Sequence, residues 1–138
     1  RAKVDGKVVG EALNEVAVVP KKAGRILRYT LRIGTEEHQE AGDGLIVATP
    51  TGSTAHALSA GGPIVKGNAR VLVVVSMNPV DWKHRPFVIN DHEKVVVSGF
   101  ERMGSQAIID CRKWFPIKKK IELLKGGKAL LATRLAGK

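Results

Sequence analysis

The sequence has a single cysteine, Cys111, which limits how the fold can be stabilised. One thiol cannot form an internal disulfide, so the fold has to rest on packing. A lone cysteine is also typical of proteins kept in a reducing compartment, and we expect a cytoplasmic location. Cys111, together with His38, His84 and His92, shows no metal-ligand spacing along the chain, so no metal site is expected.

Long hydrophobic runs and aromatic residues are scarce as well. The longest aliphatic run, Val71 to Val75, is far shorter than the roughly 20 residues that cross a bilayer, and no charged and then apolar leader opens the chain. We therefore expect no membrane partner and no export signal. Aromatic residues make up 4% of the chain and are scattered. Unspecific binders of single-stranded nucleic acid interleave basic groups with stacking rings, so that class is disfavoured.

Acidic residues are outnumbered, with 13 Asp and Glu against 23 Lys and Arg, and the net charge of +10 favours anionic partners. The densest basic run, Lys118-Lys119-Lys120, leads directly into Ile121-Glu122-Leu123-Leu124. This arrangement is more typical of a solvated strand start than of a nucleic-acid patch. A basic all-β nucleic-acid-binding module nevertheless stays an alternative, which steeply salt-dependent binding to oligonucleotides would support.

Length and patterning predict a single domain over residues 1–138, because 43% apolar content suffices for one core. Short apolar segments separated by turns predict a mainly β domain, sandwich-like or prism-like, with about nine or ten strands and one short helix after Thr51. Residues 27–33 alternate apolar with polar, which predicts a half-exposed antiparallel strand. The run 71–75 predicts a central strand with both faces covered.

Turn residues predict how the strands connect. Asp5-Gly6 lies between short apolar arms, which is a strong hairpin signal. The polar stretch 90–93 predicts a hairpin loop between strands at 87–89 and 94–97. Residues 120–124 are expected to pair with 129–133.

The most informative stretch runs from Gly42 to Pro63, where a buried apolar strand at 45–48 passes through a hydroxyl-rich turn into a short helix. Thr51 or Ser53 is expected to cap that helix, and Gly61-Gly62 to end it. The free amides of the first turn, beside threonine and serine hydroxyls, would suit a ribose hydroxyl, an adenine edge or a phosphate. By pattern alone, such a strand, loop and capped helix more often marks a plain chain reversal.

The exact residues of this stretch also indicate a protein family. Gly-Asp-Gly-Leu-Ile-Val-Ala-Thr-Pro-Thr-Gly-Ser-Thr-Ala, followed by Leu-Ser-Ala-Gly-Gly-Pro-Ile-Val, resembles the signature of the NAD kinase family, particularly its archaeal members. The resemblance continues in residues 10–16 and 85–89, and so covers nearly the whole chain. It implies the carboxy-terminal, all-β, NAD-binding domain of an enzyme that phosphorylates the 2′-hydroxyl of the adenosine ribose of NAD to make NADP. ATP or polyphosphate is the donor, and Mg2+ holds its phosphates.

The resemblance also implies roles for individual residues. Asn14 and Glu15 match a pair that contacts ribose hydroxyls, and Asp43 matches an aspartate that helps hold the dinucleotide, sometimes from a neighbouring subunit. Thr54 and Ala55 match positions at the adenine edge. Asp110 lies where the family has an aspartate near its substrate, although beside Arg112 it is also typical of a surface ion pair. The expected NAD-binding residues are Asn14, Glu15, Asp43, Thr51, Ser53, Thr54, Ala55, His56 and Ser59.

His56 departs from the family pattern, which usually has a tyrosine that stacks on adenine there. Stacking on the smaller imidazole ring remains possible, but nucleotide affinity and preference are open. We assign no catalytic role to it.

The family's Gly-Gly-Asp-Gly motif, whose aspartate is taken as the catalytic base, is absent from this sequence, since Gly42-Asp43-Gly44 belongs to a different element. We therefore expect the isolated chain to be inactive as a kinase. Members of the family assemble largely through this domain, so a dimer or tetramer is expected. An oligomerisation module is a second alternative function, and the distantly related lipid kinases match less well.

Overall fold

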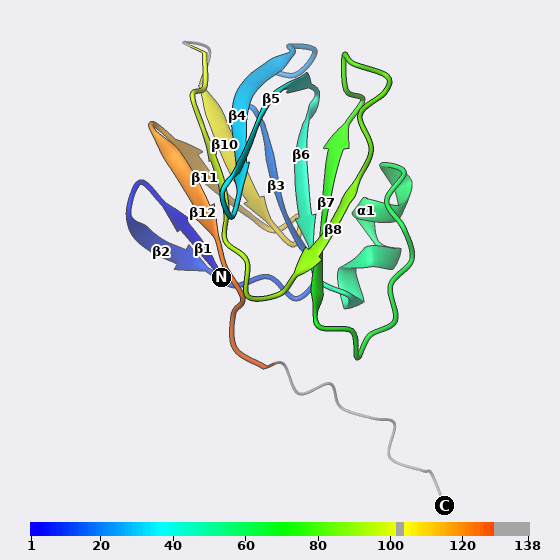
Figure 1. The fold of residues 1–138 in the computed structure, drawn as a ribbon. Coiled ribbons are helices and arrows are strands. Elements are labelled where there is room, and N and C mark those ends of the chain that lie inside the picture. Colours follow the sequence, from blue (N-terminus) through cyan, green and yellow to red (C-terminus); the bar gives the residue numbers. More distant parts are fainter. Residues whose placement is uncertain (102–103, 129–138) are drawn as a thin grey trace, which may run out of the picture.

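The computed structural model is a sandwich of two β-sheets with short helical turns on one outer side (Figure 1). The structure describes residues 1–101 and 104–128. Within these ranges it contains 12 strands, in two six-stranded antiparallel sheets. The expected mainly β class is confirmed, with more strands than the nine or ten predicted. In the same ranges no helix has the length and apolar character needed to cross a membrane.

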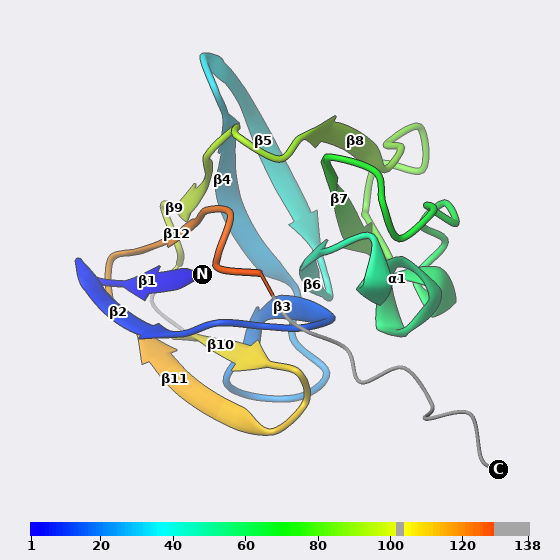
Figure 2. The same ribbon diagram turned by 90° about the horizontal axis from the view of Figure 1, so that it is seen from below.

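The two sheets are built from alternating parts of the chain. The first sheet has the order β2 (Lys7–Gly10), β1 (Ala2–Val4), β12 (Lys120–Leu123), β9 (Val95–Ser98), β4 (Leu27–Ile33), β5 (Glu36–Gly42). The second sheet has the order β11 (Lys113–Ile117), β10 (Ser105–Ile109), β3 (Glu15–Pro20), β6 (Gly44–Ala48), β7 (Val71–Met77), β8 (Phe87–Asn90). A 3-10 turn, η1 (Thr51–Thr54), and one α-helical turn, α1 (His56–Ser59), lie beside β6 and β7 (Figure 2).

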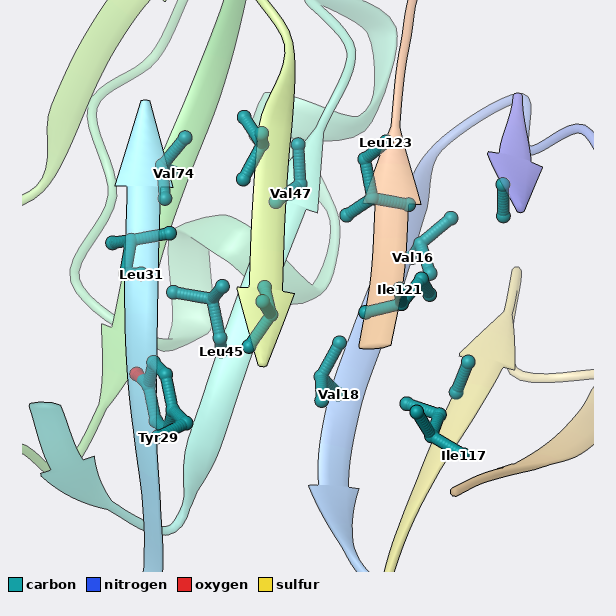
Figure 3. Packing of buried hydrophobic residues seen from close by; sticks show 14 of the residues in the cluster. Val16, Val18, Tyr29, Leu31, Leu45, Val47, Val74, Ile117, Ile121 and Leu123 are labelled. Atoms are coloured by element: carbon teal, nitrogen blue, oxygen red, sulfur yellow. The ribbon is translucent and has the colours of Figure 1, made fainter. Parts of the chain in front are cut away.

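The main core fills the space between the sheets (Figure 3). Side chains alternate along each strand, so Leu31 of β4 and Leu45 of β6 are fully buried there, together with Ile121 of β12. The predicted alternation of 27–33 is confirmed by the burial of β4, in which every second residue is buried. These apolar contacts between facing sheets are the main stabilising interaction of the fold.

A second, smaller apolar cluster covers the outer side of the second sheet. Ile46 of β6 and Val73 and Val75 of β7 pack there with Ala57 of α1. Strand β7 thus has both faces covered, as predicted, because Val74 points into the main core. The helical turns are therefore anchored to the sheet by burial of a small apolar face.

The predicted hairpin around residues 90–93 is wrong. Strand β8 pairs with β7 in the second sheet, whereas β9 pairs with β12 and β4 in the first. The polar residues do reverse the chain, but they carry it from one sheet to the other. By contrast, the hairpin at Asp5-Gly6 is confirmed, with positive φ at both turn residues and Val4 opposite Lys7.

Two other strand expectations have different outcomes. Strand β11 was not among the predicted strands, and it contains Pro116, a residue that argues against a central strand. In the structure β11 is an edge strand paired with β10, and an edge strand tolerates the missing N–H. Strand β12 pairs with β1 and β9. Its predicted partner at 129–133 lies outside the described residues.

A one-residue crossover joins the sheets at Gly42-Asp43-Gly44. Strand β5 ends at Gly42 in the first sheet and β6 begins at Gly44 in the second. A Cβ on Gly42 would lie 2.6 Å from the carbonyl oxygen of Met77, and Gly44 has a φ of 150° that side chains disfavour. Both glycines are therefore explained by the crossover. Asp43 itself is exposed and accepts a hydrogen bond of 2.7 Å from the amide of Asn78.

A polar group is buried where β4, β5 and β7 meet. The hydroxyls of Tyr29 and Ser76 lie 3.3 Å apart, and Ser76 donates to Oε2 of Glu40 at 3.4 Å. The other carboxylate oxygen of Glu40 lies 3.0 Å from Nε2 of His84. Burial raises the pKa of Glu40, and His84 opposes this effect only in part. Ionisation of the Glu40 carboxyl therefore destabilises the folded state.

We expect the variant Glu40→Gln to be more stable than the parent chain near pH 7. A carboxyl whose pKa is raised by folding contributes its stability at low pH and loses that contribution as the pH rises through the folded pKa. The difference between variant and parent should therefore vanish below the unfolded pKa of about 4.3. Thermal unfolding followed from pH 4 to 8 measures it, with the exposed Glu37→Gln on the same strand as control. A difference that does not change with pH would contradict this assignment.

Candidate functional site

The candidate site lies at the end of the second sheet where β3 begins, β6 ends and β10 turns into β11. The antiparallel register places Glu15 opposite Ala48 and Val16 opposite Ile109. The segments just beyond these pairs, around residues 14, 49 and 110, are therefore neighbours, although they are far apart in the sequence. The helical turns follow directly from β6 at this same end (Figure 2).

Asp110 holds the Asn14-Glu15 segment in place. Its carboxylate accepts hydrogen bonds from the backbone amides of Leu13 at 2.8 Å, Asn14 at 2.8 Å and Glu15 at 3.1 Å. Asp110 and Cys111 both have positive φ, of 47° and 52°, as the type I′ turn between β10 and β11 requires. The reading of Asp110 as a surface ion pair is wrong for the described part of the chain, where its carboxylate binds backbone amides instead.

Thr49 also holds the segments of the site together, a role that the sequence did not indicate. Its hydroxyl donates to the carbonyl of Leu13 at 2.6 Å and accepts from the amide of Gly52 at 3.0 Å. Its own amide donates to the carbonyl of Asn14 at 2.8 Å. Gly52 packs directly on this segment, since a Cβ there would lie 2.6 Å from the Cα of Asn14 and closer still to its carbonyl. The two segments of the site are thus fixed to each other through backbone groups.

The helix after β6 differs from the expected one. Neither η1 nor α1 has a side-chain capping bond in the described structure, and the N-cap positions are Pro50 and Ala55 rather than Thr51 or Ser53. Ala55 has φ −98° and ψ −129°, which interrupts the helix after one 3-10 turn. The predicted end is confirmed: Gly61 has φ 87°, and the amide of Gly62 donates to the carbonyl of Ala57 at 2.8 Å, a Schellman motif.

The amides of this first turn are largely used within the chain. Those of Gly52, Ser53 and Ala55 donate to Thr49 Oγ1, the Pro50 carbonyl and the Gly52 carbonyl. Ser53 is fully buried, and its hydroxyl donates to the Pro50 carbonyl at 2.7 Å and accepts from the Val65 amide at 3.0 Å. The structure therefore gives Ser53 an internal role, and the turn does not resemble a phosphate cradle.

Glu15 is the buried acid of the site. It is 4% exposed, and its Oε1 lies 3.9 Å from Sγ of Cys111. One ligand atom each of Glu15, His56 and Cys111 lies within 4.8 Å of the others. Burial raises the pKa of Glu15, which the nearby His56 partly opposes. Burial, and then the Glu15 charge, raise the pKa of the Cys111 thiol as well.

The expected site residues fall into two places. Asn14, Glu15 and the turn up to His56 lie together, with exposed side chains at Thr51, Thr54, His56 and Ser59. Asp43 lies at the opposite end of β6. The five residues of β6 lie between Asp43 and Thr49, and the extended chain spans about 20 Å from one to the other. One copy of the chain therefore does not bring Asp43 to the other expected residues.

The sequence matches the family model described as the ATP-NAD kinase C-terminal domain over residues 13–131. The chain belongs to the NAD kinase family. An NAD kinase of Methanopyrus kandleri is 36% identical over 115 residues, which are 83% of this chain and 42% of that protein. An NAD kinase of Pseudomonas paraeruginosa is 42% identical over 118 residues, which are 83% of this chain and 40% of that protein. The chain thus spans less than half the length of these relatives.

Solved structures agree with this assignment. An NAD kinase from Archaeoglobus fulgidus in complex with ATP has a TM-score of 0.82 and 29% identity, covering 91% of this chain and 50% of that one. A yeast NADH kinase complexed with NADH has a TM-score of 0.75 at 20% identity, covering 86% and 36%, and shows a shared fold. The NAD kinase family match begins at Leu13 and so contains every expected site residue.

A cavity of about 580 Å³ adjoins the site of this NAD kinase domain. It opens between the sheets, and Thr49 and Pro50 form part of its wall. Apolar Val47 and Leu72 line it together with charged residues such as Arg70. Thr49 and Pro50 therefore lie between this cavity and the exposed turn at Thr51–His56.

Proposed function

We propose that this chain is the NAD-binding domain of an NAD kinase, the enzyme that transfers a phosphoryl group from ATP or polyphosphate to the 2′-hydroxyl of the adenosine ribose of NAD. The proposal rests on one observation, which is that Asn14 and Glu15 lie next to the Thr51–His56 turn at one end of the sheet. Asp110 and Thr49 hold these segments rigidly. A site whose backbone is fixed before the ligand arrives loses little conformational entropy on binding.

The side chains suit an adenosine. The amide of Asn14 and the carboxylate of Glu15 together donate and accept, as a ribose diol requires. The exposed Thr54 hydroxyl and the backbone at Ala55 are assigned to the adenine edge, and the exposed His56 ring to its face. Thr51 and Ser59 contribute exposed hydroxyls at the margins, while Ser53 supports the turn from inside.

Asp43 is assigned to a neighbouring copy of the chain. At about 20 Å from Thr49 it lies too far away to join the adenosine residues of its own copy. A dimer or tetramer that places Asp43 against another copy's site would explain an exposed aspartate at this corner. We expect Asp43→Ala to weaken NAD binding only under conditions where sedimentation shows an oligomer, and equal loss in the monomer would contradict the assignment.

The donor site and the catalytic base are assigned to parts of the parent enzyme not contained in this sequence. Mg2+ prefers several hard oxygen ligands, whereas the Asp110 carboxylate is occupied by backbone amides and Glu15 adjoins a thiol. These residues do not fit a magnesium cage, and we derive no step through one. Loss of a general base alone slows catalysis by about 100-fold to 10,000-fold. Purified chain is expected to make no NADP from NAD and ATP.

NAD binding tests the proposal directly. Calorimetric titration should show NAD binding to the parent chain, weakened at least about tenfold by Glu15→Gln, since a buried acceptor for the ribose is altered. His56→Tyr should tighten binding about 2-fold to 10-fold, because the larger ring stacks better on adenine. His92→Tyr, at an exposed position in another loop, is the matched control. NAD binding that ignores both Glu15 and His56 would overturn this site.

A further inference from the structure

Glu15, His56 and Cys111 form a cluster whose members come from three separate segments. Glu15 begins β3, His56 begins α1, and Cys111 occupies the turn after β10. Glu15 and Cys111 are 96 residues apart in sequence, and yet Oε1 and Sγ lie 3.9 Å apart. All three ligand atoms lie within 4.8 Å of one another. Sequence spacing cannot reveal such a group, because the sheet register creates it.

One atom of this cluster lacks a partner. Oε2 of Glu15 is buried and has no hydrogen-bond partner within residues 1–101 and 104–128. The side chain is 4% exposed, so water does not readily satisfy that oxygen. Burying a carboxylate oxygen without a partner is unfavourable, because its interaction with water is lost and nothing replaces it. The group is thus incomplete without something that binds a carboxylate next to an imidazole and a thiol.

We propose that Glu15, His56 and Cys111 bind Zn2+ or a cation of similar softness. Carboxylate oxygen, imidazole nitrogen and thiolate sulfur are all ligands of zinc, with bonds of about 2.0–2.3 Å. Tetrahedral bonds of that length place ligand atoms about 3.5 Å apart, so the present spacing closes by roughly 1 Å. His56 and Cys111 are exposed and free to make this adjustment, whereas Glu15 provides the fixed point.

The ligand set favours zinc over magnesium or calcium. Those harder cations require six or more oxygens, and a thiolate and an imidazole select borderline or soft ions. Three protein ligands leave one tetrahedral position open, as in zinc sites that also bind water or a ligand group. Asp110, the residue before Cys111, anchors the turn that presents the thiol.

The cluster shares Glu15 and His56 with the adenosine site, and to that extent the inference rests on the proposed function. A cation bound there would occupy the carboxylate and the ring that NAD requires. Zinc is therefore expected to compete with NAD.

Cobalt titration of the reduced chain, in buffer without chelators, tests the metal site independently of NAD. Cys111 is the sole cysteine, so a sulfur-to-cobalt charge-transfer band reports this residue alone. We expect that band, its loss on addition of Zn2+, and protection of Cys111 from alkylation by Zn2+. Cys111→Ser should abolish the band, and His56→Gln should weaken Zn2+ binding by roughly 100-fold or more, since even supporting partners of a ligand are worth 10-fold to 100-fold.

His92→Gln is the matched control, since it removes an exposed imidazole outside the cluster. Circular dichroism shows whether each variant folds, and Cys111→Ser is an exposed, nearly isosteric change. Absence of the cobalt band in folded parent chain, or equal Zn2+ affinity of the parent and His56→Gln, would overturn the metal site. Neither result bears on NAD binding. A chain that binds Zn2+ but not NAD would overturn the proposed function and leave the metal site standing, whereas NAD affinity unchanged by saturating Zn2+ would overturn the competition.

Discussion

Replacing Asp110 with alanine is expected to lower the free energy of unfolding by about 3 kcal/mol or more. The carboxylate accepts hydrogen bonds from the backbone amides of Leu13, Asn14 and Glu15, and hydrogen bonds to a charged group contribute about 1.5–3 kcal/mol each, not additively. Alanine also tolerates the positive φ at this position less well than aspartate. Urea unfolding measures the loss. NAD binding should fall with it, because the Asn14-Glu15 segment is no longer held.

A second aspartate in the chain provides the control. Asp5, also in a type I′ turn, accepts hydrogen bonds from the amides of Lys118, Lys119 and Lys120 far from the site. Asp5→Ala should lower stability in a similar way without changing NAD affinity at temperatures where the variant is folded. Asp110→Asn, which keeps one carbonyl oxygen and the turn preference, should lie between parent and alanine. A loss below about 0.5 kcal/mol in Asp110→Ala would show that these bonds do not hold the site.

Gly52→Ala is expected to be the most disruptive small substitution near the site. Its Cβ would lie 2.6 Å from the Cα of Asn14 and closer to the carbonyl carbon and oxygen, which are backbone atoms with no rotamer to adopt. The chain has to separate by about 1 Å, which breaks the Thr49 bonds to Leu13 and Asn14. We expect a loss of about 3–5 kcal/mol, in the range of severe core changes, or failure to fold.

Gly67→Ala is the control, because it adds the same methyl group without steric conflict. Among the described residues nothing lies within 4 Å of its added Cβ. Its stability should match or slightly exceed that of the parent. Differential scanning fluorimetry of both variants and the parent measures the difference in their melting temperatures. Parent-like stability in Gly52→Ala would mean that the contact between the turn and Asn14 is looser than the structure has it.

Strand existence was predictable, but assignment of strands to sheets was not. The alternation of residues 27–33 and the apolar run 71–75 indicate which side chains are buried, and this pattern of burial predicts a strand. The polar loop after Phe87-Val88-Ile89 signals a reversal but not a partner, so a crossover was read as a hairpin. Strand β11 was missed because its tolerance of Pro116 depends on its place at the sheet edge.

The candidate site was predictable only in part, for a related reason. Asn14, Glu15 and the turn at 51–56 were found through family resemblance and share one end of the sheet. Thr49 and Asp110 form hydrogen bonds with backbone groups. Every residue has such groups, so these bonds leave no recognisable pattern in the sequence. Cys111 meets Glu15 through the pairing of β3 with β10, across 96 residues. Asp43, named by resemblance alone, lies at the other end of β6.

The crossovers between the sheets are unequal at the two ends of the sandwich. At the end with Asp43, one residue joins β5 to β6, the two residues Lys118 and Lys119, held by Asp5, join β11 to β12, and the six residues 21–26 join β3 to β4. At the opposite end, the links 11–14 and 91–94 have four residues each. The tightest of these links is therefore the single residue Asp43, where the chain passes directly from one sheet to the other. A substitution at Asp43 acts on this corner of the fold as well as on any ligand, so its effect on stability has to be measured beside its effect on NAD binding.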